Sequence, residues 1–148
     1  MVVGFIGAGN MGGAYINALN KELYFYETNK ERIKELEENT LGKGVETLKE
    51  LVEKSDILVL AIKPQILDRV LDDLKELNIK DKVLVTLVVG VKIDYYQKKL
   101  GNIKIVRVMP NTPVQVKMGV AGATFVGLNK EEKSEVLDML ESCGIVLD

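Results

Sequence analysis

The chain opens with an apolar run that leads directly into a glycine-rich turn, reading Val-Val-Gly-Phe-Ile-Gly-Ala-Gly-Asn-Met-Gly-Gly over residues 2–13. The spacing Gly7-x-Gly9-x-x-Gly12 is typical of a strand that turns sharply into a helix and brings its backbone close to a pyrophosphate. A helix beginning near Asn10 would point free amides at the phosphates, and its dipole would attract the anion without a basic side chain. The opening therefore predicts dinucleotide binding, although the bare pattern is also compatible with a simple tight turn.

A second apolar and aromatic run, residues 23–26, ends at Glu27. In a dinucleotide-binding fold an acidic side chain here accepts hydrogen bonds from the adenosine ribose hydroxyls. Because Glu27 would repel a 2′-phosphate, it favours NAD(H) over NADP(H). Thr28, Asn29 and Lys30 could still donate to that phosphate if Glu27 turned outward, and a glutamate at a strand end is often only solvated. We therefore expect NAD(H) or NADP(H), with a preference for NAD(H).

Composition limits the classes of function. The 148 residues are 47% hydrophobic and 28% charged, with a net charge of −2, which predicts one globular domain over residues 1–148, a cytoplasmic location and no nucleic-acid or membrane partner. The absence of histidine excludes a zinc site and a Ser-His-Asp triad. The single cysteine, Cys143, is expected to be a buried thiol. No catalytic or metal-binding residue is assigned.

Strand-like and helical segments alternate along the whole chain. This order predicts an α/β fold, Rossmann-type and doubly wound, with a mainly parallel sheet and helices on both faces. The expected strands cover residues 2–6, 23–26, a short run near 45, 56–62, 83–89, 104–109 and 120–126. The expected helices cover residues 10–20, 30–39, 47–54, 66–77, 93–100 and 130–142.

Two strand ends carry polar or rigid residues. The almost continuously apolar run 56–62 ends at Lys63-Pro64-Gln65, and the sixth strand ends at a proline-bracketed loop that contains Asn111 and Thr112. In parallel α/β sheets such strand ends line the ligand crevice. Asn111 and Thr112 could therefore position a ligand, or they could only form hydrogen bonds within the turn.

Four blocks of the sequence carry a resemblance: Phe-Ile-Gly-Ala-Gly-Asn-Met-Gly at 5–12, Ala-Ile-Lys-Pro-Gln at 61–65, Gly-Val at 90–91 and Val-Arg-Val-Met-Pro-Asn-Thr-Pro at 106–113. In this order, and over essentially the whole chain, they resemble the N-terminal domain of pyrroline-5-carboxylate reductase. The first block also resembles 3-hydroxyisobutyrate-type dehydrogenases and deazaflavin-dependent NADP reductases, whereas the second and fourth are specific.

The resemblance implies hydride transfer from NAD(P)H to the imine carbon of 1-pyrroline-5-carboxylate, giving proline. It assigns the cofactor to one group of residues: Gly7, Ala8, Gly9, Asn10, Met11 and Gly12 at the pyrophosphate, Glu27, Thr28 and Asn29 at the adenosine ribose, Ala61, Ile62, Lys63 and Pro64 under the riboses, Val88 and Val89 near the nicotinamide, and Asn111 toward the substrate.

The chain also departs from the family. Family members continue into a helical domain that dimerises and supplies the substrate pocket, so a homo-oligomer, or association with that helical domain, is expected. Val88 and Val89 replace two alanines near the nicotinamide, and Leu48 replaces an asparagine that reaches the adenosine. Two alternatives therefore stay open: a dinucleotide-binding module that needs a partner chain, and a reductase of another imine or ketone.

Overall fold

The computed structural model describes residues 1–110 and 119–147. The strands are β1 (Val3–Ile6), β2 (Leu23–Tyr26), β3 (Gly42–Gly44), β4 (Ile57–Leu60), β5 (Val83–Thr86), β6 (Lys104–Pro110), β7 (Gly119–Val126) and β8 (Gly144–Leu147). The helices are α1 (Asn10–Ala18), α2 (Lys30–Asn39), α3 (Leu48–Lys54), α4 (Leu67–Glu76), α5 (Ile93–Leu100) and α6 (Lys130–Glu141), with a 3₁₀ turn, η1 (Pro64–Ile66), before α4.

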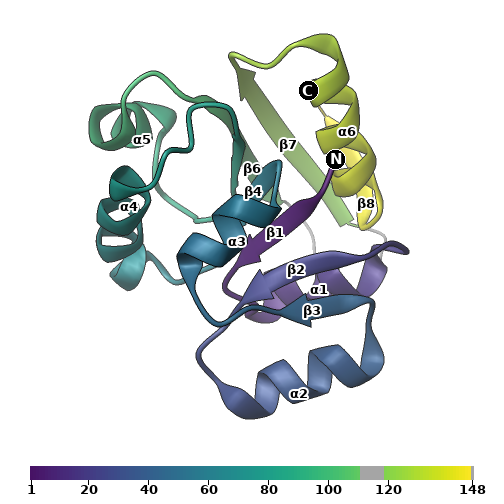
Figure 1. The fold of residues 1–148 in the computed structure, drawn as a ribbon. Coiled ribbons are helices and arrows are strands. Elements are labelled where there is room, and N and C mark those ends of the chain that lie inside the picture. The colour runs from purple at the N-terminus through teal and green to yellow at the C-terminus, as the bar shows by residue number, and fades with distance from the viewer. Residues whose placement is uncertain (111–118, 148) are drawn as a thin grey trace.

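The eight strands form one sheet in the order β3-β2-β1-β4-β5-β6-β7-β8 (Figure 1). The strands β1 to β6 are all parallel to their neighbours in this order. Strand β7 is antiparallel to β6, and β8 is parallel to β7. The predicted α/β fold with a mainly parallel sheet is thereby confirmed. The strand order reverses between β1 and β4, and the carboxyl ends at such a reversal are where this fold binds ligands.

Helices cover both faces of the sheet because its central strands are apolar on both sides. Along β4, Ile57 and Val59 face one buried cluster, while Leu58 and Leu60 face the other. Helices α1, α2 and α6 close the first cluster through Ile16, Leu36 and Val136 among others. Helices α3, α4 and α5 close the second through Leu51, Leu71 and Tyr96 among others. Each fully buried aliphatic side chain contributes about 1.5–3 kcal/mol.

The structure corrects several predicted boundaries. Strand β3 lies at Gly42–Gly44, just before Val45. Strand β5 ends at Thr86 and not at residue 89, because the Thr86 hydroxyl accepts a hydrogen bond from the Val88 amide as the chain leaves the sheet. The helix expected from residue 66 begins as η1, in which Pro64 occupies the first position.

Residues 144–147 form an edge strand, β8, which the sequence pattern did not predict. Strand β8 pairs with β7, and within it Val146 packs against the core whereas the Leu147 side chain is 57% exposed. Cys143, just before β8, is buried and donates through its thiol to the Ala14 carbonyl. None of the helices in the described residues has the length and apolar composition needed to cross a bilayer.

Glu132 joins α6 to β6. Its carboxylate accepts hydrogen bonds from the Asn129 amide at 3.0 Å and from the Lys104 ammonium at 2.7 Å, and the residue is only 6% exposed. Burial opposes ionisation, but the Asn129 amide and the Lys104 charge outweigh it, so that the pKa of Glu132 lies below its ordinary value. The side chain is therefore charged at neutral pH and stabilises the docking of α6 on the sheet.

We expect Glu132→Gln to lower the free energy of unfolding at pH 7 by about 1–3 kcal/mol, because the Lys104 ammonium loses its charged partner. Since folding lowers the pKa of Glu132, this stabilisation is present above the pKa of an unfolded glutamate, about 4.3, and is lost as the pH falls through the lower folded pKa. Urea unfolding of both proteins at neutral and at acid pH measures the difference. An equally large difference at both pH values would contradict the assignment.

Candidate functional site

The turn between β1 and α1 is pressed against the end of β4. Gly7 has a φ of +86°, and a Cβ placed on it would lie 2.6 Å from the Ala61 carbonyl oxygen. A Cβ on Gly12 would lie 2.6 Å from the Ala61 Cβ. Both distances are well inside van der Waals contact, so neither position admits a larger residue without movement of β4. These two glycines are required by the fold itself.

Gly9 differs from its neighbours. Its φ of −68° and ψ of −163° suit any residue, and the nearest heavy atom to an added Cβ is the Ala61 carbonyl oxygen, at 4.0 Å. Neither backbone conformation nor internal packing therefore explains a glycine here. The space above Gly9 is open, and a ligand could approach the backbone there.

Two clefts adjoin at Gly9. The first, here called the β2 cleft, has a volume of about 270 Å³ and lies beside the loops that follow β1, β2 and β4. The second, the β5 cleft, has the same volume and lies beside the loops that follow β1, β4 and β5. They share Gly9, Ala61, Ile62 and Lys63. Together they form one groove across the strand ends at the point where the sheet order reverses.

The groove brings together most of the predicted site residues. The β2 cleft is lined by Ile6, Gly7, Gly9, Tyr26, Glu27, Thr28, Ala61, Ile62, Lys63, Ile66 and Val70. The β5 cleft is lined by Gly9, Asn10, Met11, Gly12, Ala61, Ile62, Lys63, Pro64, Leu87, Val88 and Val89. The charged side chains in these two sets are Glu27 and Lys63.

Of the predicted residues, Ala8 and Asn29 line neither cleft. Ala8 is completely buried behind the loop, and Asn29 is the N-cap of α2, where its side chain accepts a hydrogen bond from the Arg32 amide at 3.1 Å. Asn111 lies outside the described residues, as does Thr112. The roles predicted for these residues stay predictions.

The N-terminus of α1 faces the junction of the two clefts without a side-chain cap. Gly9 is the N-cap and has no side chain to accept from the first amides, and in the described first turn there is no acidic residue. The amides of Asn10, Met11 and Gly12 thus keep the partial positive charge of a helix N-terminus, which attracts an anion. Lys63, which lines both clefts, adds a full positive charge.

Glu27 is held in place by backbone amides. Its Oε1 accepts from the Ala8 amide at 3.1 Å, and its Oε2 accepts from the Thr28 and Asn29 amides, each at 2.9 Å. The carboxylate thus connects the loop after β1 with the loop after β2 and lines the β2 cleft. A carboxylate has about four acceptor positions, so it can still accept from a ligand hydroxyl.

The floor of the β5 cleft is fixed by a buried hydroxyl pair. The Thr86 and Tyr96 hydroxyls lie 2.6 Å apart, and burial raises the pKa of Tyr96. The Thr86 oxygen also accepts from the Val88 amide at 3.2 Å. As a result Val88 is buried and Val89 is 72% exposed, so of the two valines only Val89 projects from the surface.

Sequence reasoning missed Tyr26, Ile66 and Val70, which line the β2 cleft. Ile66 and Val70 are four residues apart directly after Lys63-Pro64, and that spacing could have indicated a shared helix face.

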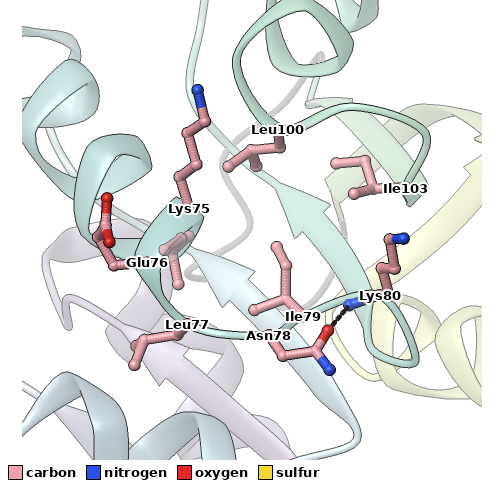
Figure 2. A pocket seen from close by; sticks show the side chains of 9 residues that line it. Lys75, Glu76, Leu77, Asn78, Ile79, Lys80, Leu100 and Ile103 are labelled. Carbon is pink, nitrogen blue, oxygen red and sulfur yellow. Dashed lines mark hydrogen bonds between the residues drawn. The ribbon is translucent and has the colours of Figure 1, made fainter.

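A third cleft, of about 300 Å³, lies where α4 and α5 end (Figure 2). Its residues Asn78, Ile79 and Lys80 precede β5, so it lies at the amino ends of the strands, opposite the groove.

The family described as "NADP oxidoreductase coenzyme F420-dependent" matches residues 2–90, which include β1 to β5 and most of the groove. The chain belongs to this family. Its curated relatives include the pyrroline-5-carboxylate reductases of Aquifex aeolicus, 37% identical over 97% of this chain, and of Escherichia coli, 30% identical over 96%. The chain spans 56% of each of these relatives, about half of their length.

Solved structures agree with this membership of the NADP oxidoreductase family. A pyrroline-5-carboxylate reductase from Coxiella burnetii has a TM-score of 0.90 and 26% identity, and covers 98% of this chain and 57% of its own. The Plasmodium falciparum pyrroline carboxylate reductase, solved with NADP bound, has a TM-score of 0.84 and 31% identity, and covers 99% and 56%. The resemblance predicted from the sequence is thus confirmed. An imine reductase from Myxococcus stipitatus, at 21% identity and a TM-score of 0.78, shares the fold.

Proposed function

We propose that the groove binds a reduced nicotinamide dinucleotide, with the adenosine half in the β2 cleft, the pyrophosphate over Gly9 and the nicotinamide half in the β5 cleft. The observation that carries this proposal is Gly9 itself, a glycine that the fold does not require, placed where the two clefts meet. The uncapped N-terminus of α1 and the Lys63 ammonium would hold the pyrophosphate charge.

The reaction that we propose is the reduction of 1-pyrroline-5-carboxylate to proline, with this chain as the cofactor-binding part. Support comes from the curated relatives and from the two specific blocks at residues 61–65 and 106–113. When bound, reduced nicotinamide would supply a hydride to the imine carbon of a substrate whose imine nitrogen carries a proton. The residues of the groove then act by holding and orienting the cofactor, which requires no histidine or metal.

The nicotinamide end of the groove exposes apolar side chains. Val89 is 72% exposed, and Met109, near the end of the neighbouring strand β6, is 51% exposed. Exposed apolar side chains at the edge of a binding site favour contact with another protein segment. We therefore propose that further protein, from the same or another chain, completes the substrate pocket there. If no such segment is present, this chain is a dinucleotide-binding module without its own activity.

Glu27 supports a preference for NAD(H). Outward rotation of its carboxylate would break three hydrogen bonds to backbone amides, and the Thr28 and Asn29 amides that could meet a 2′-phosphate are the ones that Glu27 already engages. The position that a 2′-phosphate would take is thus occupied by a negative charge. Ribose hydroxyls, which can donate to that carboxylate, fit better.

Gly9→Val is expected to reduce NADH affinity by at least about a hundredfold, because its branched side chain would fill the place assigned to the pyrophosphate, a change worth roughly 2.7 kcal/mol or more. The free energy of unfolding should change by less than about 1 kcal/mol, since an added Cβ has no close neighbour. Titration by cofactor fluorescence and urea unfolding measure the two effects. Unchanged affinity would remove the pyrophosphate assignment.

Glu27→Gln should narrow the preference for NADH over NADPH, because it removes the charge that repels a 2′-phosphate and keeps the shape of the side chain. Titrating both proteins with both cofactors gives the ratio of the four dissociation constants. If NADPH binds better than NADH to the unmutated chain, the proposed preference is wrong.

Adding 1-pyrroline-5-carboxylate to the NADH complex tests the proposed reaction, with the loss of reduced cofactor as the readout. We expect cofactor binding without turnover if another segment completes the pocket. Turnover would show that the pocket lies within this chain or between its copies. Turnover of other cyclic imines, but not of 1-pyrroline-5-carboxylate, would favour a reductase of another substrate.

A further inference from the structure

Both backbone polar groups of Ala8, at the centre of the glycine-rich loop, are bound by side chains that follow β2. Its amide donates to Glu27 Oε1 at 3.1 Å, and its carbonyl accepts from Arg32 Nε at 2.9 Å. Glu27 and Arg32 therefore each bind one backbone group of the same loop residue. Ala8 itself is completely buried, and of the two side chains that bind it, Glu27 lines the groove and Arg32 does not.

Arg32 reaches the loop because Gly13 leaves room for it. A Cβ on Gly13 would fall far inside van der Waals contact with Arg32 Nη2, and its next neighbour is the Arg32 Cζ at 3.2 Å. Gly13 lies inside α1, where a glycine weakens a helix relative to alanine. Gly13 therefore weakens α1, but it leaves the space that the Arg32 guanidinium occupies.

Arg32 has contacts that a ligand-binding arginine would not need. Its Nη1 forms an ion pair with Glu35 Oε1 at 2.8 Å, its Nε binds the Ala8 carbonyl, and its Nη2 lies against Gly13. The residue is absent from the lining of both clefts. The guanidinium is therefore directed at the loop backbone and not at the space where a phosphate would lie.

We propose that Arg32 is the positioning residue of the glycine-rich loop, and that Gly13 is present to admit it. Since the proposal rests on the proposed function, its effect is on dinucleotide binding. Arg32 fixes the carbonyl of Ala8 and with it the orientation of the Ala8–Gly9 peptide, over which the pyrophosphate would lie. A loop fixed before binding loses less conformational entropy when the cofactor arrives.

In one variant, Gly13→Ala, we expect the affinity for NADH to fall while the free energy of unfolding rises. In Gly13→Ala the new methyl group displaces the end of the flexible Arg32 side chain, so NADH affinity should fall by about tenfold. The same change should raise the free energy of unfolding, since alanine favours the helix over glycine. A residue with a purely structural role would not separate these two quantities.

A double-mutant cycle tests the coupling. Arg32→Ala should also lower NADH affinity by about tenfold, and Gly13→Ala in the Arg32→Ala background should have no further effect on affinity. Lys34→Ala removes an equal charge from an exposed position of α2 and should change affinity by less than about twofold. Additive effects of the two substitutions, or an equal effect of Lys34→Ala, would overturn the proposal.

The two cofactors and the free protein complete the test. A positioning role predicts the same loss for NADH and NADPH, whereas a loss confined to NADPH would show that Arg32 contacts a 2′-phosphate and would overturn the proposal. In the free protein, hydrogen exchange of the Ala8 amide should accelerate in both Gly13→Ala and Arg32→Ala. This readout needs no ligand, so failure of the unmutated chain to bind either cofactor would contradict the proposed function while exchange still decided the role of Arg32.

Discussion

The contact between the glycine-rich turn and the end of β4 is the constraint on which the rest of the structure depends. Ala61 occupies the space in which side chains at Gly7 and Gly12 would otherwise lie, so α1 can pack on the sheet only if both are glycines. That packing directs the N-terminus of α1 across the strand ends where the sheet order reverses. The groove, its positive end and its division into two clefts all follow from this close approach.

Around that contact, polar side chains hold the backbone of the loops on both sides of Gly9. Glu27 and Arg32 bind the amide and the carbonyl of Ala8 from the β2 side. On the β5 side the Thr86 hydroxyl, which is paired with that of Tyr96, accepts from the Val88 amide. Gly9, between them, contacts little, and the space over it is open. A fixed frame around an open centre is the arrangement expected of a binding site, since preorganised polar groups lose little entropy when a ligand arrives.

If the nicotinamide half lies in the β5 cleft, as we propose, the exposed surface beside that cleft explains how membership of an oxidoreductase family can be combined with a chain that spans about half the length of its curated relatives. In the proposed function the groove supplies the contacts for a dinucleotide, while the surface around Val89 and Met109 is exposed and apolar. We propose that this surface is covered during the reaction. The division would place cofactor binding in this chain and substrate recognition at the boundary with further protein.

Sequence alone predicted the α/β class, most strand and helix positions and most of the groove residues, because hydrophobic periodicity and glycine spacing are local properties. It could not predict β8, since the run at residues 144–147 is apolar in either case and only β7 beside it makes it a strand. The sequence pattern predicted no role for Arg32, which lies in a charged helix of the kind that usually faces solvent. It also predicted no role for Gly13. Both acquire meaning only when α1 and α2 are brought together, because a hydrogen bond between residues 24 positions apart depends on tertiary packing.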